Sequence, residues 1–245
     1  MIDTSPPPPP NRWLVLVSAV VSFFAVAVTF FAVPPLIPSL VEHFGLSNFQ
    51  IGLLVGSIAI PAVFLSTPLG AAIDRWPPRA TGNFGLGIML IGASLFAAAP
   101  NYIALLTGRF LFGIGGLVIN LLLARLLTEA FSGKQLALAM GIFMAVYPAG
   151  MISIFSSHSL MLGAFGWRGE LGVLAALVVV ALPLHNFAVP KVNSNETADP
   201  SEDEGHHALG LPLVMLSLSW MLFFAAFASV PTFAPQWIGG GQAAL

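Results

Sequence analysis

The chain has 245 residues, of which 8 are Lys or Arg and 10 are Asp or Glu, so only 7% are charged. Ordinary globular domains carry roughly 25%, and a soluble fold of this size needs more charge to cover its surface. A net charge of −2 without a basic cluster excludes a nucleic-acid-binding protein. The absence of cysteine excludes disulfides, iron–sulfur clusters and Cys-ligated zinc. The composition therefore predicts a multi-pass protein of the lipid bilayer.

Residues 1–12 contain five consecutive prolines and lack the basic segment and the small-residue cleavage site of a signal peptide. We expect a Pro-rich cytoplasmic tail, followed by a first span that is retained. Seven apolar runs follow, each about long enough to cross a ~30 Å hydrocarbon layer as a helix. Their unbroken apolar character favours helices over barrel strands, which would alternate in segments of about ten residues. The runs cover residues 13–36, 47–72, 82–99, 102–127, 136–160, 168–189 and 209–231.

The connections between the first six runs are short, so consecutive spans must be antiparallel. We therefore expect a six-helix transmembrane bundle at 13–189. Basic residues favour the cytoplasmic side of a membrane, and a cytoplasmic N-terminus leaves only Arg168 in an outer loop. We therefore expect a multi-pass protein of the plasma (cytoplasmic) membrane with its N-terminus in the cytoplasm. The basic residues expected at or near cytoplasmic ends are Arg12, Arg75, Arg79, Arg125, Lys134 and Lys191.

After six runs the sequence becomes polar and acidic, which predicts a flexible cytoplasmic linker at 190–208. The pattern V-P-x-x-x-P occurs at 33–38, at the end of the first run, and again at 230–235. This recurrence suggests a duplicated six-helix unit. We expect 209–245 to be the first helix of a second bundle, and the chain to be incomplete, without the rest of its C-terminal bundle.

The loop after the second run has the spacing G-x-x-x-D-R-x-x-x-R, formed by Gly70, Asp74, Arg75 and Arg79. Glycine allows another helix to approach closely, Asp74 can accept hydrogen bonds, and the two arginines offer planar forks to carboxylates or headgroups. This spacing between two spans is more specific than a scatter of basic residues. The alternative is a cytoplasmic loop whose basic residues only set the topology.

The fourth run carries Arg109 in its interior. At 100° per residue, Arg109, Gly113, Gly116 and Asn120 fall within about 40° of one another, so we expect them to meet a common neighbour. A buried intramembrane arginine costs several kcal/mol unless it is paired, which predicts a functional side chain facing the bundle lumen. The alternative is an Arg109 that snorkels to the outer interface. The glycines, with Gly115, are predicted to pack helices.

These patterns resemble the major facilitator superfamily of transporters, over residues 12–231. The loop residues match the family's loop 2–3 signature, apart from Pro77 and Pro78. The fourth-run residues Arg109, Gly113, Gly115 and Gly116 match its R-x-x-x-G-x-G-G motif, whereas Gly141 and the stretch 147–150 only partly match the drug/proton antiporter motif.

The resemblance implies half of a 12-helix fold, plus its seventh helix, in which two bundles rock about a central site. It implies that the Asp74 loop acts as a cytoplasmic latch, and that Arg109 and Asn120 take part in substrate or proton coupling. Arg109 also favours an anionic solute.

A polar stretch ends the fifth run and includes Ser157, His158 and Ser159. His158 is a weak candidate for a proton carrier. The simpler interpretation is that the serines bond to their own helix and that His158 lies at the outer interface. An intramembrane enzyme using these residues is disfavoured, because no oxyanion-stabilising or base-orienting group is evident. No metal or cofactor site is expected, since His206 and His207 lack supporting ligands.

The sequence thus predicts a secondary active transporter of a small solute, coupled to an ion gradient with a proton as a candidate ion, and not an enzyme. The alternative is a non-transporting truncated membrane component or partner subunit that retains only the fold.

Overall fold

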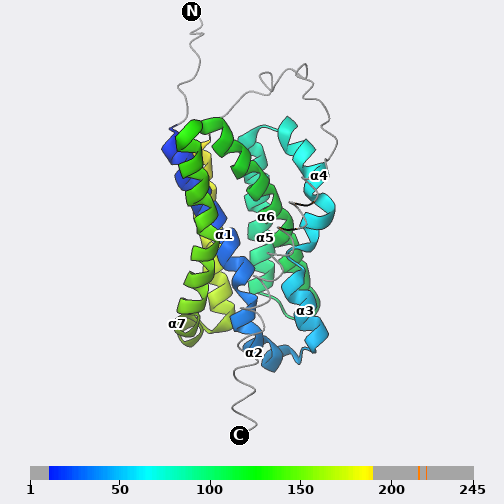
Figure 1. The fold of residues 1–245 in the computed structure, drawn as a ribbon. Coiled ribbons are helices and arrows are strands. Elements are labelled where there is room, and N and C mark those ends of the chain that lie inside the picture. The colour runs from blue at the N-terminus through cyan, green and yellow to red at the C-terminus, as the bar shows by residue number, and fades with distance from the viewer. Residues whose placement is uncertain (1–10, 190–214, 216–218, 220–245) are drawn as a thin grey trace, which may run out of the picture. The chain divides into compact units, whose positions relative to one another are not determined.

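The computed structural model describes residues 11–189 together with Met215 and Ser219. Every regular element of these residues is a helix, which confirms the predicted all-α membrane fold (Figure 1). Five helical stretches of these residues are long and apolar enough to cross a membrane, one of them, Asn48–Arg75, formed by two consecutive helices. In chain order the helices are α1 (Arg12–Phe31), α2 (Val33–Phe44), α3 (Asn48–Gly56), α4 (Ile60–Arg75), α5 (Pro78–Ala97), α6 (Tyr102–Ala130) and α7 (Gly133–Ala188).

By its contacts the chain divides into two units, Met1–Thr197 and Ala198–Leu245. Most of the Pro-rich tail, the predicted linker at 190–208 and the second V-P-x-x-x-P at 230–235 lie outside the described residues. The predictions for these segments therefore stay predictions.

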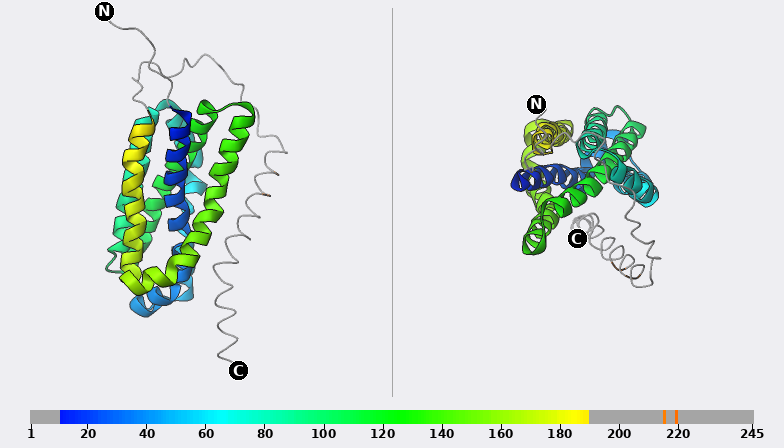
Figure 2. Two further views of the ribbon diagram at one scale, coloured as in Figure 1. Left: turned by 90° about the vertical axis from the view of Figure 1, so that its left-hand side faces the viewer. Right: turned by 90° about the horizontal axis from the view of Figure 1, so that it is seen from above.

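Helix α7 is 56 residues long, but its backbone leaves the helical region at Gly166, with φ 66° and ψ 174°. A positive φ is accessible to glycine at little cost, so the chain reverses there. The result is a first arm, 133–165, and a second arm, 167–188, which are the predicted fifth and sixth runs. Figure 2 shows the two arms as antiparallel helices with α1 between them.

The first two runs each form a pair of helices rather than one. Pro34 and Pro35 lack the N–H groups that would bond to the carbonyls of Phe30 and Phe31 in a continuous helix, and α1 gives way to α2 at Ala32. Pro61 has the same effect at the start of α4, where residues 57–59 separate α3 from α4. The structure thus places a helix break at these prolines, whereas Pro38, Pro148 and Pro183 lie inside helices.

Helices α5 and α6 are continuous and cross at glycines. A Cβ on Gly92 would lie 2.5 Å from the backbone nitrogen of Phe112 and 2.7 Å from the carbonyl oxygen of Gly108. A Cβ on Gly115 would lie 2.5 Å from the carbonyl oxygen of Gly85. Only glycine allows two helix backbones this close, so the α5–α6 pair forms a tight frame for the rest of the bundle.

The up-and-down path of the chain collects the predicted cytoplasmic basic residues at one end, called the basic end below, except Lys191, which lies outside the described residues. There the Arg12 Nη1 donates to Gln135 Oε1 at 2.8 Å, and Trp13 packs edge-on against Phe131, with 5.5 Å between ring centroids. At the opposite end, called the far end, Trp167 packs against His43 with 5.4 Å between centroids. This agrees with the predicted up-and-down topology (Figure 1).

Candidate functional site

Arg109 lies in the interior of the bundle and is fully buried. Its Nη1 and Nη2 donate to the carbonyls of Thr29 and Phe30, both at 3.0 Å, and its Nε donates to the carbonyl of Leu54 at 2.9 Å. The guanidinium carbon also lies 5.7 Å from the centre of the Phe96 ring. Hydrogen bonds from a charged donor each contribute about 1.5–3 kcal/mol, so three of them offset much of the cost of burying the charge.

The carbonyls that Arg109 binds belong to the two helix breaks. Pro34, one turn after Phe30, has no N–H to donate to the Phe30 carbonyl. The carbonyl of Leu54 accepts the Ser57 hydroxyl at 2.9 Å as well as Arg109, at the end of α3. Arg109 therefore ties α6 to the breaks of both the first and the second span.

Two interpretations of Arg109 from the sequence are wrong. Its side chain has no exposure, so it does not face a lumen, and it does not snorkel to an interface. Backbone carbonyls at the two helix breaks accept hydrogen bonds from it instead. Sequence spacing shows where a helix places a residue, but not which distant carbonyls lie within its reach.

The prediction that Arg109, Gly113, Gly116 and Asn120 meet one common neighbour is also wrong. Gly113 abuts the backbone of Ile58, between α3 and α4, whereas a Cβ on Gly116 would make only ordinary contact, at 3.5 Å, with Val26 of α1. Asn120 is exposed within the first unit. Helix α6 thus meets different segments along its length, so residues on one face do not share one partner.

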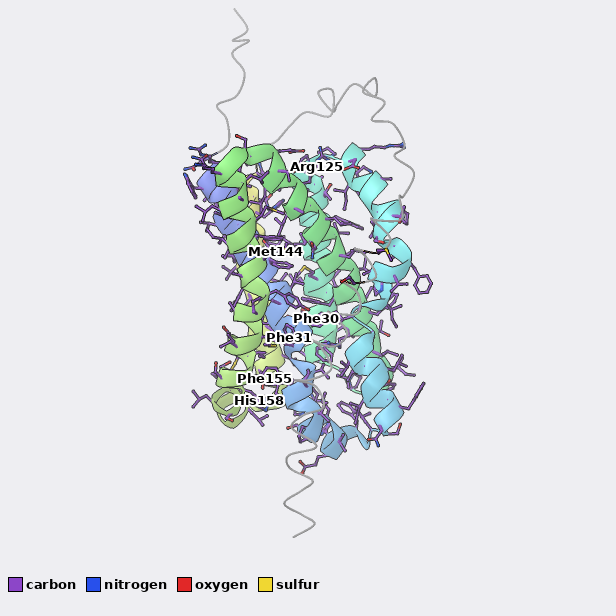
Figure 3. The ribbon with its side chains drawn as sticks, in the orientation of Figure 1. Phe30, Phe31, Arg125, Met144, Phe155 and His158 are labelled. Atoms are coloured by element: carbon purple, nitrogen blue, oxygen red, sulfur yellow. The ribbon has the colours of Figure 1, made fainter. Side chains whose placement is uncertain are left out.

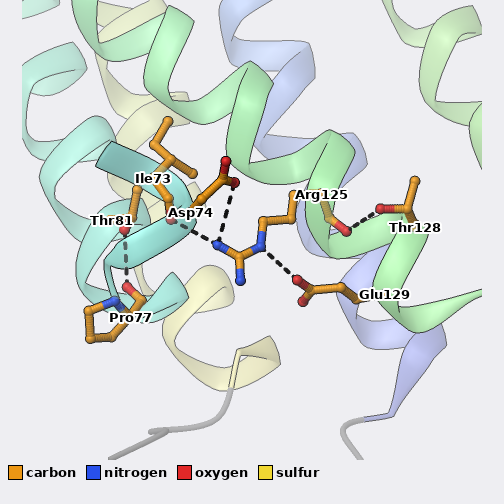
Figure 4. Close-up of polar contacts among 7 residues, drawn as sticks. All are labelled: Ile73, Asp74, Pro77, Thr81, Arg125, Thr128 and Glu129. Atoms are coloured by element: carbon orange, nitrogen blue, oxygen red, sulfur yellow. Dashed lines mark hydrogen bonds and ion pairs between the residues drawn. The ribbon is translucent and has the colours of Figure 1, made fainter. Parts of the chain in front are cut away.

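The loop 2–3 residues lie at the basic end, where Arg125 of α6 holds the end of α4 (Figure 4). Arg125 Nη1 donates to the carbonyl of Ile73 at 2.8 Å and lies 3.9 Å from Asp74 Oδ1. Its Nε donates to Glu129 Oε1 at 2.6 Å. Asp74 is 74% exposed, and Arg75 is also exposed. The sequence analysis assigned Arg125 only a role in topology, because its partners Ile73 and Asp74 lie on another helix.

Arg79 faces a different partner. Its Nε donates to Asn186 Oδ1 at 2.8 Å, near the end of the second arm of α7. Asn83 and Asn186 also exchange two hydrogen bonds, at 3.0 and 2.7 Å. Next to them the buried His185 ring packs on Gly82, in the space a side chain there would fill. Arg79 is thus anchored inside the first unit, whereas Asp74 and Arg75 are not.

Pro77 and Pro78, the two positions at which this loop differs from the loop 2–3 signature, shape the turn. Pro77 precedes α5 and Pro78 is its first residue, a position where the missing N–H costs nothing and the fixed φ suits a helix. The turn between α4 and α5 is therefore short and stiff.

The polar stretch of the first arm behaves partly as expected. Ser153, Ser156 and Ser157 donate to carbonyls of the preceding turn at 2.7–2.8 Å. His158, however, is not a solvated interfacial residue. Its side chain is 16% exposed, and its Nδ1 lies 3.0 and 3.1 Å from the two carboxylate oxygens of Glu170.

Glu170 was missed at the sequence level, although a signal was present. It lies inside the predicted run 168–189, and an ionisable residue within a span is a functional candidate by default. It is also the orienting group that had been judged absent beside His158. Within the described residues, no group of three or more His, Asp or Glu residues is placed to hold a metal ion.

Aromatic side chains join α1 to the first arm next to the Arg109 carbonyls. The rings of Phe30 and Phe31 lie 5.6 and 4.9 Å from the Tyr147 ring, and Phe23 stacks on Phe143 at 4.4 Å. Figure 3 shows Phe30 and Phe31 in the middle of the bundle, between Arg125 near the basic end and His158 near the far end.

The sequence was compared with known proteins. It is 31% identical over 138 residues to the nitrate/nitrite transporter NrtP of Picosynechococcus sp., covering 54% of this chain and 25% of that protein. It is 27% identical over 206 residues to human monocarboxylate transporter 11, covering 83% of this chain and 41% of that one. The chain thus spans less than half the length of these relatives.

Among solved structures, the fold is similar to a bacterial homologue of the human lysosomal transporter Spinster, in an inward-facing and unoccupied conformation. The TM-score is 0.71 at 19% identity, over 93% of this chain and 55% of that one. The Major Facilitator Superfamily matches residues 17–242. With the bundle and both motifs in place, the chain belongs to the major facilitator superfamily of membrane transporters.

Proposed function

We propose that the complete protein moves a small solute across the cytoplasmic membrane by alternating access, driven by an ion gradient, with its N-terminus in the cytoplasm. Family membership supports transport, and the relatives are named for solutes as different as nitrate/nitrite, monocarboxylates, polyols and 2-nitroimidazole. Placing the basic end in the cytoplasm follows the preference of Arg and Lys for that side.

The observation that carries the proposal is the uncovered loop at the basic end. A Cβ on Gly70 would meet nothing within 4 Å, the Asp74 side chain is 74% exposed, and Arg75 is exposed. A contact between Asp74 and a second bundle that forms in one state and breaks in another would bias the two states. Arg125 then acts as a local competitor for Asp74, because it lies 3.9 Å away.

Arg109 takes a different part in this proposal from the one its position in the sequence suggests. Because it is fully buried and bonded to three carbonyls, we assign it to positioning the broken spans rather than to contacting the solute. Its charge therefore no longer favours an anionic solute, and the solute class stays open.

Uptake by the complete gene product in proteoliposomes tests the function, with a panel of nitrate, monocarboxylates, polyols and nitroimidazoles. We expect uptake of one of these solutes, and a reduction of about tenfold in Asp74→Asn, equivalent to about 1.4 kcal/mol. The protein yield and helix content should not change, because Asp74 is exposed.

Glu42→Gln is the matched control, since Glu42 is an exposed carboxylate at the far end, and its uptake should equal that of the wild type. Uptake by Asp74→Asn equal to that of the wild type would contradict the proposed latch role of Asp74. No uptake of any solute by the wild type would instead favour a non-transporting component that retains the fold.

A further inference from the structure

Two ionisable side chains near the far end have no part in the proposed latch. Glu170 is the one fully buried carboxylate among the described residues, and the His158 Nδ1 lies 3.0 and 3.1 Å from its two oxygens. The reversal at Gly166 brings them together from opposite arms of α7. Figure 3 places His158 next to this turn.

The other charged groups of the packed helices lie elsewhere or have other partners. On α7, Arg168 stacks over Trp167, at 4.3 Å from the ring centre, and donates to the carbonyl of Ala99. On α2, His43 and Glu42 are exposed, and His43 packs against Trp167.

The remaining helices bring no competing charge to Glu170. The ionisable groups of α1, α5 and α6 are at the basic end or engaged with carbonyls: Arg12, Arg79, Arg109, Arg125 and Glu129 form the contacts described above. Tyr102 donates to the carbonyl of Gln50, and Tyr147 packs in the aromatic cluster with Phe30 and Phe31. Among the described residues, His158 is thus the one side chain within ion-pair distance of Glu170.

We propose that His158 and Glu170 form a proton-binding site that holds the coupling ion of the transporter, an inference that rests on the proposed function. Buried ionised groups are costly unless paired. With one proton bound, imidazolium and carboxylate form a pair with no net charge. Without it, a carboxylate stays buried beside a neutral ring. Binding therefore adds one proton from water to the imidazole, with the Nδ1–H donating to Glu170, and release returns that proton to water.

Proton uptake of the purified complete protein in lipid nanodiscs tests the site without any solute. Between pH 8 and pH 5 we expect Glu170→Gln to take up about one proton per chain fewer than the wild type, because His158 loses the charge that stabilises its protonated form. Glu42→Gln, an exposed carboxylate near the same end, should match the wild type.

Unchanged uptake in Glu170→Gln would overturn the proposal, because His158 would then titrate independently or the pair would keep its proton throughout. If Glu170→Gln does not fold, the double variant His158→Gln/Glu170→Gln, which replaces the pair with two neutral amides, gives the same measurement. The loss of one proton relative to wild type is again the expected result, and equal uptake is the contrary one.

Proteoliposomes separate this inference from the proposed function. With the solute found in the screen, wild-type protein should accumulate it when a pH gradient is imposed, and Glu170→Gln should exchange it across the membrane without accumulating it. A wild type that moves no solute refutes the proposed function. The proton-uptake measurement in nanodiscs then still tests the His158–Glu170 site by itself. A wild type whose accumulation ignores the pH gradient refutes the coupling role alone.

Discussion

The α5–α6 pair and the broken spans α1–α2 and α3–α4 are built in different ways. The pair consists of unbroken helices whose glycines bring backbone against backbone, as at Gly92 and Gly108. The broken spans lose helical hydrogen bonds at prolines, and carbonyls next to the breaks bond to Arg109, which projects from α6. The comparison teaches that the rigid pair and the breaks depend on each other, because the glycine contacts set where Arg109 reaches.

The largest effect is expected when the link between the two regions is removed. Arg109→Ala removes one hydrogen-bond donor from each of the carbonyls of Thr29, Phe30 and Leu54, and we expect the free energy of unfolding to fall by about 3 kcal/mol or more. Arg109→Lys keeps the charge but cannot fork to three carbonyls, so it should recover only part of the loss. Unfolding by SDS titration measures both variants.

Arg168→Ala is the control for this variant, because Arg168 donates to a single carbonyl at the far end. The free energy of unfolding should fall by well under half as much in Arg168→Ala as in Arg109→Ala. Equal losses for Arg109 and Arg168 would show that the breaks do not depend on the buried guanidinium.

A smaller effect is expected within the rigid pair. Gly92→Ala places a methyl group against the backbone of Phe112 and Gly108, which should cost about 1–3 kcal/mol, as overpacking does. Gly87 lies on the same helix with nothing within 4 Å of a Cβ. Gly87→Ala should therefore be neutral, or stabilising by about 0.5–1 kcal/mol through helix propensity. The same SDS titration compares the two, and a Gly92→Ala variant as stable as Gly87→Ala would refute the tight crossing.

The smallest effect is expected where the rigid pair touches a break. Gly113→Ala meets the backbone of Ile58, in the short segment 57–59 between α3 and α4. Because this segment is not held in a helix, it can shift more easily than α5, so we expect a loss of about 1 kcal/mol. Gly116→Ala meets only Val26, at ordinary contact distance, and should be close to neutral. A larger loss for Gly116 than for Gly113 in the same titration would reverse this assignment of contacts.

Much of the fold was predictable from local patterns. Apolar runs of membrane-spanning length, short connections and the distribution of basic residues were enough to predict an antiparallel helical bundle with one basic end. The glycines and arginine of the fourth run were recognisable by their spacing, and the prolines marked both helix breaks. These features depend on residues close in sequence, and the hydrocarbon layer acts on each span in the same way.

The partners of the candidate residues were decided by the tertiary structure. Arg109 binds carbonyls from two other spans, Asn120 is exposed, and Arg125 reaches Ile73 across a helix interface. Such contacts depend on the tilt and depth of helices whose residues are far apart in the sequence. The pairing of His158 with Glu170 depends on a single reversal at Gly166, because two polar side chains in lipid find each other only when the backbone brings them within reach.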